Sequence, residues 1–216
     1  MSKPNRLVLF DIDGTLLRGA GPHHKQALVE AIRRVTGIWT TLDGVATSGM
    51  LDRDLIVRML LDSGCSRRRI HASLIQIVNE ARRSYLRSCA TDLRAAVCSG
   101  VLEFLERLRQ QSITLGLVTG NLSTIAWKKV QLAGLRGFFN VGAFSEDGAT
   151  RKDLARIAAH RARTRRLIQA DARIALIGDH SNDIQAAKAN GFRAIAVATG
   201  FTSLGELQAF QPDFAV

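Results

Sequence analysis

Two carboxylates stand close together directly after a short apolar run near the amino terminus. Residues 10–15 read FDIDGT, so Asp11 and Asp13 are two positions apart and are followed by Gly14. On an extended chain this spacing points both carboxylates to one side, and the glycine permits a sharp turn. Such a pair can supply a nucleophile, a general acid or base, or ligands for a hard cation. An EF-hand calcium loop is excluded, because acids do not fill the later ligand positions of that loop.

Two further polar segments also follow apolar runs. Residues 175–183 read ALIGDHSND, which places Asp183 one helical turn beyond Asp179. Residues 117–121 read LVTGN, and there the hydroxyl of Thr119 and backbone N–H groups at a helix start can hold an anion. Open α/β sheets bind ligands at the carboxyl ends of their strands, so we expect all three segments to contribute to one site.

Short apolar runs alternate with amphipathic stretches along most of the chain. We expect buried strands over 7–10, 113–118, 173–177 and 194–197, and a weaker strand over 141–144. Helical patterns over 101–108, 125–133 and 181–190 separate these runs, and the last two end at Gly134 and Gly191. The alternation predicts an α/β fold with a doubly wound parallel sheet.

The alternation stops between residues 18 and 91. No strand pattern is found there, and helices are expected over 22–36, 54–61 and about 70–85, with Ser66 as the N-cap of the third. We therefore expect a catalytic core made of residues 1–17 and 92–216. A helical insert of residues 18–91 interrupts this core after its first strand.

The composition bounds the class of protein. The chain has 216 residues and 46% hydrophobic residues, which suffices for a substantial core, and no apolar run approaches the ~18–20 residues of a membrane span. No secretory signal is expected at the amino terminus. Three cysteines, Cys65, Cys89 and Cys98, lack the spacing of a metal site or disulfide framework, which favours the reducing cytoplasm.

The net charge of +11 is concentrated in part on one segment. Residues 151–166 hold seven basic side chains and a single acidic one, Asp153. Such a face can attract nucleic acid or any anionic ligand. No aromatic residues alternate with these charges to stack on bases, so we interpret the segment as a solvated arginine-rich helix and do not expect nucleic acid as a partner.

The segments DIDGTL, VTGN and GDHSND resemble the first, second and fourth motifs of the haloacid dehalogenase-like hydrolases. The resemblance covers essentially the whole chain, including an insert similar to that family's C1-type cap. It is closest to the phosphoglycolate-phosphatase-like and β-phosphoglucomutase-like members. The resemblance implies a Rossmann-like core and a Mg²⁺-dependent phosphohydrolase that acts on a small phosphorylated metabolite.

The resemblance also implies roles for the acidic residues. Asp11 would attack phosphorus and form an aspartyl-phosphate, while Asp13 would protonate the leaving alkoxide and then activate water. Mg²⁺ would be held by Asp11, Asp179 and the backbone carbonyl of Asp13, with Asp183 as a ligand directly or through water.

The family's second and third motifs bind the phosphoryl group and neutralise its charge. By resemblance, Thr119 and the amides of Gly120 and Asn121 would hold phosphoryl oxygens. The third motif is normally a lysine, and Arg151 and Lys152 are both candidates at the start of a helix. The pattern slightly favours Arg151, and the sequence leaves the choice open.

Substrate selection would fall to the insert, where Arg18 and Arg53 can approach the site. Two other functions stay open at this point. One is a phosphotransferase of the sugar phosphomutase type, and the other is a non-catalytic protein that binds nucleic acid or another anion. A C–Cl dehalogenase is disfavoured, because Asp13 supplies the acid and base that phosphoryl chemistry uses. The sequence predicts no oligomeric state.

Overall fold

The computed structural model describes residues 4–45 and 47–216 and contains a six-stranded parallel sheet in the order β3-β2-β1-β4-β5-β6. The strands are β1 (Arg6–Phe10), β2 (Thr114–Val118), β3 (Val141–Ala143), β4 (Arg173–Gly178), β5 (Arg193–Ala196) and β6 (Phe214–Ala215). All adjacent strands are parallel, so their carboxyl ends share one edge of the sheet. The predicted doubly wound α/β core is confirmed.

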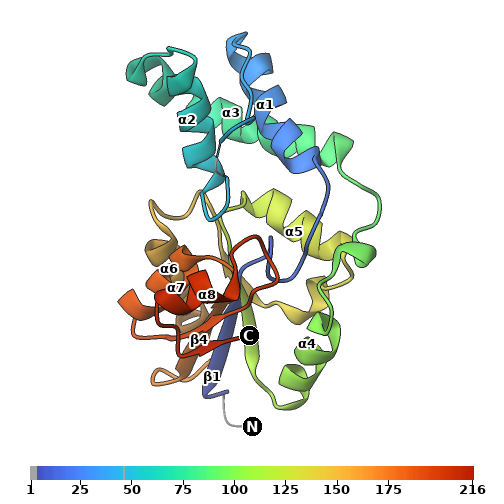
Figure 1. The fold of residues 1–216 in the computed structure, drawn as a ribbon, viewed down its shortest axis with the longest axis vertical. Coiled ribbons are helices and arrows are strands. Elements are labelled where there is room, and N and C mark those ends of the chain that lie inside the picture. The colour runs from blue at the N-terminus through green and yellow to red at the C-terminus, as the bar shows by residue number, and fades with distance from the viewer. Residues whose placement is uncertain (1–3, 46) are drawn as a thin grey trace.

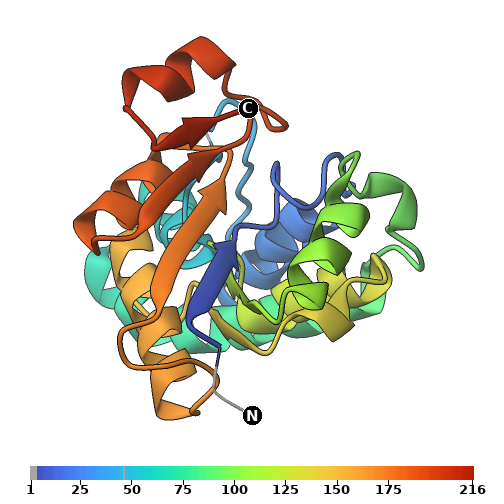
Figure 2. The same cartoon turned by 90° about the horizontal axis from the view of Figure 1, so that it is seen from below.

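Helices cover both faces of this sheet. They are α4 (Val101–Gln110), α5 (Ser123–Leu132), α6 (Arg151–Thr164), α7 (Ser181–Ala189) and α8 (Leu204–Ala209), with short 3₁₀ turns η1 (Arg94–Ala96) and η2 (Arg136–Phe138). Helices α6 and α7 pack on one face, and α4 and α5 lie on the other (Figure 2). Strand β1 is central and points Leu7 and Leu9 to the first face and Phe10 to the second, which fixes where the following Asp11 emerges.

Residues 18–91, in the connection from β1 to β2, contain three helices, as the sequence predicts: α1 (His23–Thr36), α2 (Asp52–Asp62) and α3 (Arg67–Ser88). We call residues 18–91 the insert. Ser66 caps α3 by accepting a hydrogen bond from the backbone of Arg69. Figure 1 shows the insert standing beyond the carboxyl edge of the sheet. Its apolar cluster also contains Leu122 and Ile125, so the insert packs onto the core through α5.

The strand predictions differ from the structure mainly at the carboxyl terminus. Strand β6 has only two residues, Phe214 and Ala215, which is too short a run for alternation or burial to show in the sequence. The other strand ends agree to within a residue, because these strands are largely buried on both faces and so give nearly continuous apolar runs.

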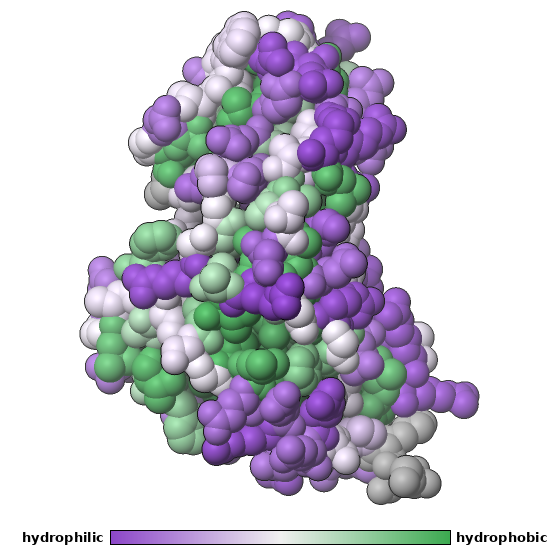
Figure 3. Space-filling view, turned by 90° about the vertical axis from the view of Figure 1, so that its right-hand side faces the viewer, coloured by the Kyte–Doolittle hydropathy of each residue, from purple (hydrophilic) through white to green (hydrophobic). Residues whose placement is uncertain are grey.

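Polar and charged side chains cover most of the face drawn in Figure 3, and apolar side chains gather on its lower half. Among residues 4–45 and 47–216, no helix combines the length and apolar character of a membrane span.

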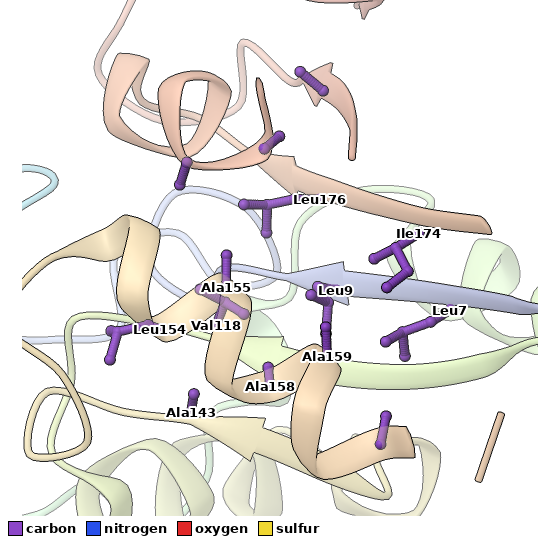
Figure 4. Packing of buried hydrophobic residues seen from close by; sticks show 14 of the residues in the cluster. Leu7, Leu9, Val118, Ala143, Leu154, Ala155, Ala158, Ala159, Ile174 and Leu176 are labelled. Atoms are coloured by element: carbon purple, nitrogen blue, oxygen red, sulfur yellow. The ribbon is translucent and has the colours of Figure 1, made fainter. Parts of the chain in front are cut away.

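Replacing Leu9 by Ala tests the packing that positions β1. Leu9 is fully buried and faces Ala159 of α6 (Figure 4). A leucine-to-alanine change at a buried position leaves a cavity, so we expect the free energy of unfolding to fall by ~2–5 kcal/mol in urea titrations. Leu102→Ala on α4, where the side chain is 49% exposed, is the control and should change stability by less than ~1 kcal/mol. Equal losses in the two variants would contradict this packing.

Candidate active site

Three buried carboxylates meet at the carboxyl edge of the sheet. Asp11 follows β1, Asp179 follows β4, and Asp183 lies in the first turn of α7, with one oxygen of each within 4.8 Å of the others. Glycine is required beside them. A Cβ on Gly14 would lie 2.1 Å from a carboxylate oxygen of Asp179, and one on Gly200 would lie 1.8 Å from it. The structure thus brings the DIDGTL and GDHSND segments together.

The electrostatics of this cluster suit a cation. Desolvation raises the pKa of both Asp179 and Asp183, and the charge of Asp11 raises both pKa values further. Neither side-chain oxygen of Asp183 receives a hydrogen bond from the described part of the chain. Carboxylate oxygens without thiolate or imidazole ligands are the donor set that Mg²⁺ prefers. The three side chains therefore fit a hard divalent cation.

Arg151 is the cation that the chain itself supplies to this cluster. Its Nη1 donates to an oxygen of Asp11 over 3.1 Å, and its Nε lies 3.3 Å from an oxygen of Asp183. A capping box between Thr150 and Asp153 begins α6, so Arg151 is the first helical residue and its side chain is buried against the sheet edge. Lys152 is exposed. Of the two third-motif candidates, the structure brings only Arg151 to the carboxylates.

The Thr119-Gly120-Asn121 segment forms a tight loop after β2. The Thr119 hydroxyl accepts from the Asn121 side-chain amide at 3.1 Å, and that amide also donates to Asp13 at 2.8 Å. A Cβ on Gly120 would lie 2.2 Å from the carbonyl oxygen of Met50 in the insert. The loop is therefore enclosed between the core and the insert.

Asp13 has a cationic partner that sequence reasoning missed. The Nζ of Lys129, on α5, lies 2.7 Å from each carboxylate oxygen of Asp13. The signal was present: Lys129 interrupts the apolar stripe formed by Ile125 and Leu132. Desolvation raises the pKa of Asp13, but the charge and hydrogen bonds of Lys129, together with His24 and the hydrogen bond from Asn121, outweigh it and lower the pKa to about 2.

Asp52, at the start of α2, fastens the insert to the core. Its carboxylate accepts from the backbone N–H of Leu122 at 2.7 Å and contacts Nε2 of His24 at 2.9 Å. Its own backbone N–H donates to the carbonyl of Gly120 at 2.8 Å. A second attachment is the ion pair of 2.6 Å between Arg82 of α3 and Glu146 of the core.

A cavity of about 380 Å³ lies between the sheet edge and the insert. Its lining includes Asp11, Asp13, Thr119, Gly120, Asn121, Lys129, Arg151 and Asp179. Arg18 also lines it, as the sequence predicts. Arg53 does not: its backbone N–H donates to the hydroxyl of Ser145, and the residue lines a separate hollow. Arg53 therefore lies outside the cavity lining in this structure, and its approach to the substrate stays a prediction.

Solved structures with low sequence identity share the fold. A β-phosphoglucomutase from Clostridium difficile superposes with a TM-score of 0.74 at 16% identity, covering 100% of this chain and 91% of that one. A predicted phosphatase from Clostridium acetobutylicum gives a TM-score of 0.69 at 20% identity, covering 100% of this chain and 94% of the other.

A curated relative is more similar in sequence over a shorter region. It is a phosphoglycolate phosphatase from Synechococcus elongatus, 30% identical over 116 residues, which are 53% of this chain and 52% of the relative. The chain thus spans about half the length of the curated relative that it matches. Residues 5–191, which contain the sheet edge, the insert and the three buried carboxylates, match the haloacid dehalogenase-like hydrolase family. The chain therefore belongs to the haloacid dehalogenase-like hydrolases.

Proposed function

We propose that the protein is a Mg²⁺-dependent phosphatase that hydrolyses a small phosphorylated metabolite through an aspartyl-phosphate on Asp11. The observation that carries the proposal is the placement of Asp11 in the cavity, against Arg151 and beside Asp13. A nucleophilic carboxylate with an adjacent acid and base and a buried cation is the set that phosphoryl transfer requires. The cavity volume suits a small metabolite.

In the first half-reaction, a carboxylate oxygen of Asp11 attacks phosphorus and the bond to the leaving alkoxide breaks. Asp13 gives its proton to that alkoxide, while Arg151 and the Thr119 loop stabilise the charge on the phosphoryl oxygens. Bound to Asp11, Asp179, the Asp13 carbonyl and Asp183, Mg²⁺ would offset the repulsion between the phosphate and the nucleophile.

In the second half-reaction, Asp13 takes a proton from the water that attacks phosphorus. The acyl-phosphate bond breaks, which releases inorganic phosphate and regenerates Asp11. The low pKa of Asp13 keeps it ionised without substrate, the form that a base requires. An entering phosphate dianion raises this pKa, because like charges disfavour the ionised form, and so favours the acid form when the leaving group needs it.

The division of the chain supports the same function. We infer that residues 18–91 act as a cap over a core of residues 1–17 and 92–216, because α1–α3 have their own apolar cluster beyond the cavity. Arg18 would contact the part of the substrate that lies outside the transferred phosphoryl group. We place the protein in the cytoplasm, and the free thiols of Cys65, Cys89 and Cys98 support this.

Asp11→Asn tests the nucleophile. The amide keeps the shape of the carboxylate but attacks phosphorus poorly, so we expect turnover of a panel of phosphorylated metabolites with Mg²⁺ to be abolished while circular dichroism is unchanged. Wild-type enzyme quenched during turnover should carry one phosphoryl group on Asp11 by mass spectrometry. Asp62→Asn, whose side chain is 48% exposed on α2, is the control and should retain wild-type turnover. Turnover by Asp11→Asn within a few-fold of wild type would contradict the assignment of Asp11 as the nucleophile.

Arg151→Met and Lys152→Met form a matched pair at the start of α6. Loss of the buried guanidinium removes a charge-stabilising donor, so kcat/KM for Arg151→Met should fall by ~10²–10³-fold. Lys152 is exposed, so its variant should stay within a few-fold of wild type. Similar losses in both variants would show that the third-motif role is not confined to Arg151.

Mg²⁺ binding should weaken as pH falls. The raised pKa values of Asp179 and Asp183 mean that the ion-free cluster holds protons near neutral pH, and a cation must displace them. Release of one proton changes the affinity by about tenfold per pH unit. Isothermal titration calorimetry at pH 6 and pH 8, in buffers of different ionisation enthalpy, measures both effects. The same affinity at both pH values, with no proton release, would contradict the expected coupling.

A further inference from the structure

The buried ammonium of Lys129 has an acceptor for each of its three N–H groups. Two are the carboxylate oxygens of Asp13, at 2.7 Å each, and the third is Nδ1 of His24, at 3.0 Å. The Lys129 side chain is 3% exposed, whereas that of Asp13 is 42% exposed. Burying an ammonium group costs free energy unless each of its N–H groups has an acceptor, and here all three have one. Lys129 holds Asp13 from the protein side and leaves the cavity side open.

The contact with His24 extends this pairing into the insert. An ammonium only donates, so Nδ1 of His24 must accept, and the ring proton lies on Nε2. Nε2 then donates to Asp52, which also accepts from the backbone of Leu122 at the start of α5. The chain of contacts from Asp13 through Lys129 and His24 to Asp52 therefore begins at the catalytic turn, crosses α1 and α2, and returns to the helix that carries Lys129.

We propose that Lys129 is a positioning residue that fixes the carboxylate of Asp13 for proton transfer, and that His24 and Asp52 of the insert hold Lys129 in place. The inference rests on the proposed phosphatase function and deepens it. With both oxygens held by one ammonium and one of them also by Asn121, the carboxylate plane is fixed. Displacement of the insert removes the third acceptor of Lys129, so the acid and base are fully aligned only when the insert is docked.

Lys129→Met and Lys129→Gln are compared with Lys128→Met, which removes the same charge one residue away on α5. If Lys129 positions Asp13, the Lys129 variants should show the same kinetic pattern as an enzyme that has lost its general acid and base. Nitrophenolate departs without a proton, so the burst with p-nitrophenyl phosphate should stay within a few-fold of wild type. The turnover that follows, and phosphorylation by alkyl phosphates, should fall by ~10²-fold, since a small misplacement of a reacting group costs about that much. KM should change little with alkyl phosphates, where both steps slow, and should fall with p-nitrophenyl phosphate, where only the second step slows. Lys128→Met should match wild type.

A double-mutant cycle with Asp13→Asn separates positioning from a general structural role. Adding Lys129→Met to Asp13→Asn should slow turnover by less than about threefold, because coupled residues are not additive. His24→Phe keeps a ring against Tyr85 but accepts no hydrogen bond, so it should give a weaker loss of the same pattern.

Equal losses of burst and alkyl phosphorylation in folded Lys129 variants, or an additive double mutant, would overturn the positioning role. If His24→Phe has the same kinetics as the wild type, the part played by the insert is overturned. A wild-type protein without Mg²⁺-dependent turnover would overturn the proposed function and this inference with it. If the wild-type protein shows Mg²⁺-dependent turnover and the Lys129 variants have the same kinetics, this inference alone is overturned.

Discussion

Repulsion among three buried carboxylates is the constraint on which the rest of the site depends. Asp11, Asp179 and Asp183 lie within 4.8 Å of one another at the sheet edge, where little water reaches them. Like charges in such a place are stable only if protons, a metal or a fixed cation offset them. Arg151 supplies one fixed positive charge, and its position follows from the capping box that begins α6. The remaining negative charge suits the cluster to a cation.

Asp13, only two positions from Asp11, has a different environment. Its carboxylate opens to the cavity and pairs with Lys129, whereas Asp11 shares its surroundings with other acids and Arg151. Two carboxylates on one turn are thereby separated in chemistry, which suits one to attack phosphorus and the other to move protons. The division comes from the side chains packed around the turn, because the residue types are identical.

The insert contributes to this separation as well as enclosing the cavity. It packs on α5 through a shared apolar cluster, and Asp52 joins the start of α2 to the backbone on either side of Asn121. Helix α5 therefore connects three features: its start follows the Thr119 loop, its apolar face packs against the insert, and its buried lysine contacts Asp13. Movement of the insert relative to α5 would therefore change the contacts of the loop, of the apolar cluster and of Lys129.

The sequence by itself determined the central strands, the helical insert and the carboxylates at the strand ends. Continuous burial leaves an apolar run that can be read without tertiary information, and an acid after such a run must lie at the sheet edge. Only the tertiary structure brought Arg151 rather than Lys152 to the carboxylates, placed Arg53 outside the cavity lining and paired Lys129 with Asp13. These outcomes depend on which direction a helical side chain takes and on what lies opposite it. That partner comes from a segment more than a hundred residues away for Lys129 and Arg151, so no local pattern encodes it.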